Sequence, residues 1–193
     1  MSGSQSGPVG RVPPGGFRQL GPVNWVLAKL GARTVGAPEM HLFTTLGYRQ
    51  LLFWAWLVYG GRLLRGRLPR VDTELVILRV AHLRACEYEL QHHRRMARSR
   101  GLDANMQAAI FAWPDVPDGP GPRRVLSARQ EALLRATDEF VKDRSISDGT
   151  WQRLATHLDR RQLIEFCMLA SQYDGLAATI TALEIPLDNP GHR

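Results

Sequence analysis

The sequence predicts an all-α protein, and three observations support this fold class. Apolar residues recur at helical spacing along most of the chain. Four serine or aspartate residues stand where helices are expected to begin. No segment shows the apolar and polar alternation of a half-buried strand. We therefore expect a multi-helix domain that follows a flexible N-terminal tail.

Length and composition are those of an ordinary globular protein. The 193 residues suit one domain with a tail, and 44% apolar and 22% charged residues argue against a fully disordered chain. The net charge of +7 comes mainly from arginine, since Lys29 and Lys142 are the only lysines. The arginines are scattered over several predicted helices and accompany no nucleic-acid-binding motif, so we expect a solvated cationic surface and no nucleic-acid partner.

Cysteine usage and hydropathy indicate a cytoplasmic protein. Cys86 and Cys167 are too few for a disulfide scaffold and are not spaced as a metal knuckle. The first residues lack the apolar core of a signal peptide. The longest apolar run, Leu51–Tyr59, is far shorter than the roughly 20 residues that span a bilayer. We expect no membrane span.

The N-terminal part divides into three segments. Residues 1–22 are rich in glycine and proline and predict a flexible tail. Residues 23–40 predict a short helical extension, with a helix from Val23 to about Val35. The following stretch, His41–Leu64, is so rich in aromatic and aliphatic residues that it suits a core or an oligomer interface. A membrane-surface helix flanked by arginines is the alternative interpretation of this stretch.

The next and longest helix is expected over Thr73–Arg100, because this stretch has neither glycine nor proline and Gly101 suits a left-handed cap. Asp103 then predicts the start of a short helix that ends near Ala112. The prolines and glycines of Trp113–Arg124 predict a loop.

Three capping signals predict the C-terminal helices. Ser127 and Gln130 form a capping box that opens a helix to Arg144. Ser147 suits the start of a helix to about Leu158, and Asp159 the start of a last helix to about Ile185.

The chemically informative residues lie in the helix predicted over Thr73–Arg100. At about 100° per residue, Cys86, Glu89 and His93 fall within an arc of about 60°. His82 joins the same stripe, whereas His92 points roughly 100° away from His93. The spacing therefore places a thiol, a carboxylate and an imidazole on one face.

Glu89 and His93 form a candidate acid–base pair, because a carboxylate four residues before an imidazole can hydrogen-bond to it. Cys86 could act as a nucleophile, but the nearby carboxylate opposes thiolate formation. Polar residues at this spacing are also common on solvated helix faces, and a lone cysteine is often a small buried apolar residue. A metal site is not expected, since no matching motif occurs on another helix.

The string ELVILRVAHLRACEYELQHHRRMARSRGL resembles the signature of the carboxymuconolactone decarboxylase and alkylhydroperoxidase D-like family. A glutamate opens the apolar run, a tyrosine-bearing segment and a helical histidine follow, and Gly-Leu ends the helix. The resemblance covers about residues 41–187 and leaves 188–193 as a C-terminal tail. It implies an alkylhydroperoxidase D-like all-α fold.

In the alkylhydroperoxidase branch, the resemblance places Glu74, Cys86 and His93 at the spacing of the active-site residues. The second cysteine of that branch is replaced by Glu89. One thiol cannot close the intramolecular disulfide of the peroxidase relay, so that activity requires Cys167 or another chain as resolving thiol.

In the decarboxylase branch, the resemblance requires only the Glu89 and His93 pair. On one continuous helix Glu74 would lie about 120° round from Cys86, so it reaches the site only if the helix bends or breaks. Tyr88 and His82 are candidate substrate-binding side chains.

Three functional hypotheses follow. The first is a decarboxylase-like lyase that uses Glu89 and His93 on a small carboxylated or lactone-type molecule. The second is a peroxiredoxin-type antioxidant oxidoreductase that uses Cys86, and the third is a non-catalytic binding protein. No cofactor is expected, because no phosphate-binding glycine loop is present. The aromatic stretch and the resemblance imply a homo-oligomer, a trimer or a multiple of it.

Overall fold

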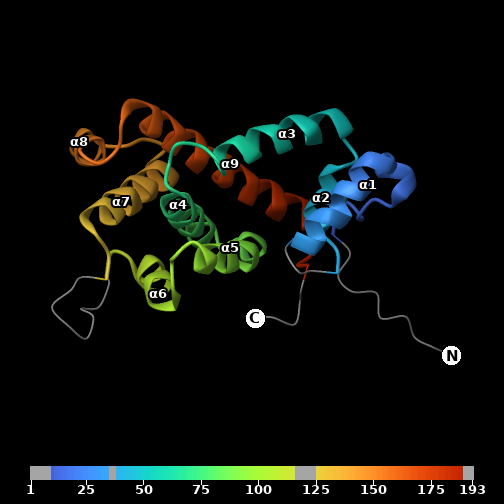
Figure 1. Ribbon diagram of the computed structural model, residues 1–193, viewed down its shortest axis with the longest axis horizontal. Coiled ribbons are helices and arrows are strands. Elements are labelled where there is room, and N and C mark those ends of the chain that lie inside the picture. Colours follow the sequence, from blue (N-terminus) through green and yellow to red (C-terminus); the bar gives the residue numbers. More distant parts are fainter. Residues whose placement is uncertain (1–9, 35–37, 116–124, 189–193) are drawn as a thin grey trace. The chain divides into compact units, whose positions relative to one another are not determined.

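The computed structural model describes residues 10–34, 38–115 and 125–188, and within these ranges every regular element is an α-helix (Figure 1). The predicted all-α class is therefore confirmed. The chain forms two compact units, one from the N-terminal part to Tyr59 together with the segment from Thr179, the other from Gly60 to Ala178. Each unit is described by itself.

The helices of the first unit are α1, α2 and most of α3. Their bounds are Phe17–Thr34, His41–Leu46 and Gln50–Leu63. The second unit holds the remaining helices and most of α9. Their bounds are Arg70–Leu83 for α4, Glu87–Ser99 for α5, Ala104–Ala112 for α6, Ala128–Asp143 for α7, Asp148–Ala155 for α8 and Arg160–Leu183 for α9.

Helix α1 begins at Phe17, so the prediction of a start at Val23 is wrong by six residues. The break expected from Gly21 and Pro22 is present, but as a kink within the helix, with Gly21 at φ 73°. Glycine adopts this left-handed conformation without steric cost, and proline suits the first position of the helical segment that follows. The first nine residues of the predicted tail lie outside the described residues.

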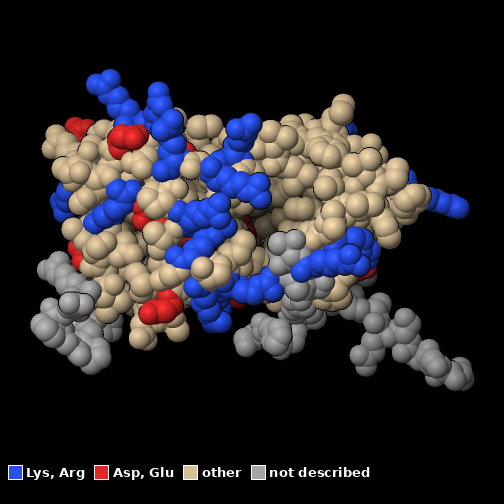
Figure 2. All heavy atoms as spheres, in the orientation of Figure 1, with Lys and Arg blue, Asp and Glu red and all other residues tan. Residues whose placement is uncertain are grey.

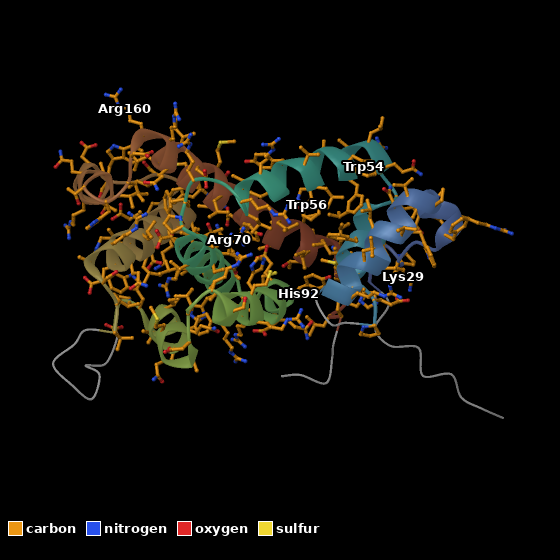
Figure 3. All side chains as sticks on the ribbon, in the orientation of Figure 1. Lys29, Trp54, Trp56, Arg70, His92 and Arg160 are labelled. Atoms are coloured by element: carbon orange, nitrogen blue, oxygen red, sulfur yellow. The ribbon has the colours of Figure 1, made fainter. Side chains whose placement is uncertain are left out.

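The apolar stretch predicted as His41–Leu64 forms two helices, α2 and α3, rather than one. Phe53 of α3 is 1% exposed, and its ring packs against those of Phe43 and Trp56 at centroid distances of 5.2 and 6.0 Å. In Figure 3, Trp54 and Trp56 project from opposite sides of α3. Part of the aromatic stretch therefore forms core, and the predicted homo-oligomer stays a prediction.

Helix α4 is the central helix of the second unit. The side chains of Leu75, Val76, Ile77, Leu78 and Val80 are all fully buried. Helices α5, α6 and α7 pack against α4, which is why its apolar run has no solvated face (Figure 1). Burial of this run contributes to the hydrophobic stabilisation of the unit.

A buried ion pair connects three of these helices. Arg79 of α4 donates from Nε and Nη2 to the two carboxylate oxygens of Asp138 on α7, at 2.6 and 2.8 Å. Its guanidinium also donates to the carbonyl oxygens of Ile110 and Trp113, at 3.0 Å each. The planar guanidinium is thus satisfied on several sides, which offsets the cost of burying its charge.

The predicted capping signals are confirmed in the second unit. Ser127 and Gln130 form the capping box of α7. The Asp103 side chain accepts from the backbone at the start of α6, and Ser147 does so at the start of α8. Gly101 has a φ of 98°, as expected for a residue that ends a helix.

The prediction of one helix over Thr73–Arg100 is wrong, because α4 ends at Leu83 and α5 begins at Glu87. Ala85, between them, has a φ of 50°, and the backbone N–H of Cys86 donates to the carbonyl of Ala81 at 2.9 Å. A left-handed alanine is unfavourable by itself, so local preferences do not predict a break here. The contacts that hold it are tertiary and involve the candidate site.

No helix in the described part of the chain is long and apolar enough to cross a membrane.

The Arg79 ion pair predicts a large stability effect. Replacing Arg79 with methionine removes the charge that compensates Asp138, so we expect the free energy of unfolding to fall by about 3 kcal/mol or more. Urea denaturation measures this change. The matched control is Lys142→Met, since Lys142 is an exposed second partner of Asp138 at 3.3 Å and should contribute less than about 1 kcal/mol. Equal losses in the two variants would contradict the role assigned to Arg79.

Candidate functional site

The break between α4 and α5 brings Glu74 to His93. The Oε2 atom of Glu74 and the Nδ1 atom of His93 are 2.8 Å apart, and the Glu74 side chain is fully buried. Arg100, which follows α5, donates from Nη1 to the other oxygen of the same carboxylate. Of the two geometries considered for Glu74, the broken helix is the one observed. Glu74 therefore accepts hydrogen bonds from two side chains, one in the middle of α5 and one just after it.

These contacts define what His93 can do. Glu74 is a carboxylate paired with a guanidinium, so it acts as the acceptor and His93 donates from Nδ1. The neutral ring then carries its lone pair on Nε2. A histidine fixed in this way by a carboxylate is oriented for proton transfer at Nε2.

Glu89 is buried on α5, and it is not the hydrogen-bond partner of His93 that the sequence predicted. It is 3% exposed, and among the described residues its carboxylate has no hydrogen-bond partner other than the Cys86 thiol. Burial raises the pKa of Glu89 to about 8; the hydrogen bond from the Cys86 thiol opposes this rise, and the Asp174 carboxylate adds to it. Glu89 therefore holds its proton at neutral pH, and the carboxylate that orients His93 is Glu74.

Cys86 precedes the first residue of α5 and is 3% exposed. Burial and, to a smaller extent, the charge of the neighbouring Glu89 raise the pKa of its thiol to about 12. A helix N-terminus by itself favours a thiolate, but desolvation outweighs this effect here. Cys86 is consequently a neutral thiol near neutral pH.

Two residues near this group were not identified from the sequence, Tyr173 and Arg100. The ring of Tyr173, on α9, meets that of His93 edge-on, with centroids 5.1 Å apart and planes at 88°. Burial raises the pKa of Tyr173 well above its usual value, and the charges of Glu74 and Glu89 act in the same direction. No pattern in the sequence links α9 to α5, so only the fold reveals this contact.

An ion-pair cluster fixes the connection between α4 and α5. Asp174, the residue after Tyr173, accepts hydrogen bonds from Arg84 in that connection and from Arg144 after α7. Burial opposes ionisation of Asp174, but the hydrogen bonds from the two arginines lower its pKa. The cluster attaches the connection to α9 close to Cys86 and Glu89.

The predicted substrate-binding residues lie in two different places. Tyr88 is 3% exposed and its ring lies 4.9 Å from that of His92, which is labelled on α5 in Figure 3. His82 is exposed at the end of α4, with its ring 5.2 Å from that of Phe111 on α6. The break after α4 ends the helical stripe on which the sequence placed His82 beside Cys86. The binding roles of both residues stay predictions.

Within the described residues no group of three or more ligating side chains is arranged to hold a metal ion. The assembled group therefore consists of a buried imidazole, two carboxyl groups, a thiol and a phenol, all within the second unit. These groups are suited to move and hold protons.

Residues 50–132 match the model of the carboxymuconolactone decarboxylase family. This segment of the chain belongs to that family. The match includes Glu74, Cys86, Glu89 and His93, and so confirms the family predicted from the same residues. No curated protein matches the chain.

Three solved structures with the same fold share 14–16% sequence identity with the chain. An uncharacterized peroxidase-related protein from Ralstonia eutropha JMP134, described as an alkylhydroperoxidase AhpD core, has a TM-score of 0.78 over 95% of each chain. A peroxidase-related protein from Silicibacter sp. TM1040 has a TM-score of 0.69 over 83% of this chain and 82% of its own. A protein of unknown function from Agrobacterium tumefaciens has a TM-score of 0.62 over 70% and 90%. At these identities the likeness establishes the AhpD-like fold alone.

The raised pKa of Glu89 predicts how stability depends on pH. Below about pH 4.5 Glu89 is protonated in both the folded and the unfolded chain. Between about pH 4.5 and 8 the unfolded chain loses this proton while the folded one keeps it, so the free energy of unfolding falls as pH rises. We expect Glu89→Gln to remove this contribution and flatten the decline.

Urea denaturation at several pH values across this window measures the effect. The control is Glu87→Gln, because Glu87 is an exposed carboxylate two residues away on the same helix. An unchanged decline in Glu89→Gln would show that Glu89 does not keep its proton in the folded protein.

Proposed function

We propose that this protein is an acid–base enzyme of the carboxymuconolactone decarboxylase type, acting on a small carboxylated or lactone-type molecule. The observation that carries the proposal is the hydrogen bond from His93 to the buried Glu74, next to a buried Glu89 that has no charged partner within the described residues. One histidine is thus oriented for proton transfer, and one carboxylic acid is kept protonated. Two titratable groups in such different environments are typical of acid–base sites.

Each group has a defined role in this proposal. In a decarboxylation, the bond between the carboxylate carbon and its neighbour breaks, carbon dioxide leaves, and the electron pair moves towards an adjacent carbonyl oxygen. Glu89 supplies the proton that the resulting carbanion or enolate takes up. His93, held by Glu74, returns a proton from solvent to Glu89. The net change is uptake of one proton and loss of one carbon dioxide.

Tyr173 supports the same chemistry. Its raised pKa keeps the phenol neutral, so its hydroxyl remains a donor at any physiological pH. A neutral donor beside His93 is suited to stabilise negative charge that develops on a carbonyl oxygen. The proposal therefore adds Tyr173 to the acid–base group as an oxyanion donor.

A thiol peroxidase is the second candidate, favoured by the spacing of Glu74, Cys86 and His93 and by the peroxidase-related proteins of like fold. The state of Cys86 argues against it, because a neutral thiol with a pKa of about 12 is a poor nucleophile near pH 7. Cys167, the other cysteine, is partly buried on α9, and burial raises the pKa of its thiol as well. The acid–base proposal instead uses Glu89 as a protonated acid, a role that its raised pKa supports.

Variants of the proposed groups distinguish the two candidates. The purified protein is incubated in deuterated buffer with a panel of lactone acids and β-keto acids, while NMR follows loss of carbon dioxide and deuterium uptake. With a reactive compound, we expect Glu89→Gln and His93→Gln to lower the rate at least about 100-fold. Cys86→Ser should retain the rate within about threefold, since the thiol takes no part.

Organic hydroperoxides test the second candidate in the same preparations. Fast oxidation of Cys86, located by mass spectrometry and lost in Cys86→Ser, would favour the peroxidase. If none of these substitutions changes the rate of either reaction, the result would instead favour a non-catalytic binding protein.

The rate should also depend on pH in a defined direction. Glu89 must be protonated to act as the acid, so turnover should fall as pH rises above about 8. Glu89→Asp keeps a carboxyl group, so its turnover should be lower but should still fall as pH rises. The residual turnover of Glu89→Gln should not show this fall. If the fall persists unchanged in Glu89→Gln, another group causes it.

A further inference from the structure

The net positive charge of the chain is concentrated in its first third. Residues 1–71 contain nine arginine and lysine residues and a single acidic residue, Glu39. Five of these basic residues lie in the first unit, and the other four follow Tyr59 in the second. Residues 72–193 contain sixteen basic and seventeen acidic residues and are nearly neutral. A strong charge asymmetry between two parts of a chain is typical of proteins that bind a polyanion or an anionic surface.

Exposed apolar side chains are concentrated in the same part of the chain. Of the thirteen large apolar residues that are exposed within the described ranges, ten lie between Phe17 and Val58. Helix α3 contributes Leu51, which is 86% exposed, and α1 contributes Phe17, which is 55% exposed. In Figure 2 the surface of the N-terminal helices is mostly tan, with blue side chains at its edges. Such a surface combines positive charge with apolar area.

The clearest example is one face of α1. Val23, Val26 and Leu30 follow one another at helical spacing and are 48–55% exposed. Lys29 and Arg33 lie on the same side of the helix at the same spacing and are exposed. This face of α1, called the basic apolar face below, has the pattern of a helix that lies in a membrane interface.

A hollow lies on the basic apolar face. Its volume is about 380 Å³, and it is lined by apolar side chains that include Trp25, Val26 and Leu30, and by Lys29 and Arg33. The Lys29 ammonium lies 5.8 Å from the centre of the Trp25 ring and 3.8 Å from a Glu39 oxygen. Glu39 thus offsets part of the positive charge of Lys29 and Arg33, while Glu184 and Asp188 of the same unit pair with Arg11 and His41.

We infer that the basic apolar face of α1 binds the surface of an anionic lipid bilayer. Lys29 and Arg33 contact the headgroup phosphates, while Trp25, Val26 and Leu30 enter the region between headgroups and acyl chains. A nucleic acid would satisfy the charge but leave the apolar side chains exposed. A second copy of the chain would cover the apolar side chains but bring like charges together. The bilayer satisfies both features and needs no membrane-spanning helix.

Sedimentation with lipid vesicles tests the inference on the full-length protein. We expect binding to vesicles of phosphatidylcholine and phosphatidylglycerol to be at least about tenfold stronger than to phosphatidylcholine alone. Raising the salt concentration from about 0.05 to 0.5 M should weaken this binding, because it screens the arginines and lysines. Equal binding to the two vesicle types would overturn the inference.

Two double variants separate the charged from the apolar contribution. Lys29→Glu with Arg33→Glu should weaken binding to anionic vesicles about tenfold or more, and Val26→Gln with Leu30→Gln should do the same at low salt. All four side chains are exposed or partly exposed, so circular dichroism should show an unchanged fold. The matched controls lie in the second unit: Arg153→Glu with Arg160→Glu, and Ile164→Gln, all at exposed positions.

The controls should leave vesicle binding unchanged. Equal weakening by the control variants would show that overall charge, not the basic apolar face, attracts the lipid, and would overturn the assignment. Light scattering without lipid tests whether a second copy of the chain covers this face. If the protein does not bind vesicles and Val26→Gln with Leu30→Gln dissociates an oligomer, the second copy is the partner and the inference is overturned. Binding of duplex DNA with no vesicle binding would equally refute the bilayer.

Discussion

The candidate site depends on the burial of one carboxylate, that of Glu74. A carboxylate fully removed from water is strongly unfavourable unless it is hydrogen-bonded and paired with a positive charge. Glu74 meets this requirement through His93 and Arg100, one on α5 and the other immediately after it. Both partners reach it only because the chain turns at Arg84–Cys86, where Ala85 takes a left-handed conformation. The cost of that turn is small beside the cost of leaving Glu74 unpaired.

The chemistry of the site follows from a contrast between two buried glutamates. Glu74 receives hydrogen bonds from a histidine and an arginine, whereas Glu89 has no partner among the described residues other than the Cys86 thiol, and burial raises its pKa to about 8. One carboxylate thus orients a base and the other retains a proton. Burial keeps Cys86 beside it a neutral thiol. The glutamate at the position of the expected second cysteine therefore removes a thiol from the candidate site and adds a buried carboxyl group.

The two compact units differ in composition as well as in position along the chain. The second unit holds the buried polar groups of the candidate site. The first holds most of the exposed large apolar residues among those described. An acid–base site needs groups shielded from water, while a surface for an anionic partner needs groups exposed to it. The candidate site and the basic apolar face lie in different units.

The sequence by itself determined the helical class, the capped starts of α6 to α9 and the segment that holds the site, because helix periodicity and caps are local properties. It also placed Cys86, Glu89 and His93 close together. Only the tertiary structure decided that Glu74, not Glu89, bonds His93, and that Tyr173 joins them from α9. Nothing in the residues around Ala85 signals a break, since the break is stabilised by burying and pairing Glu74 across two helices.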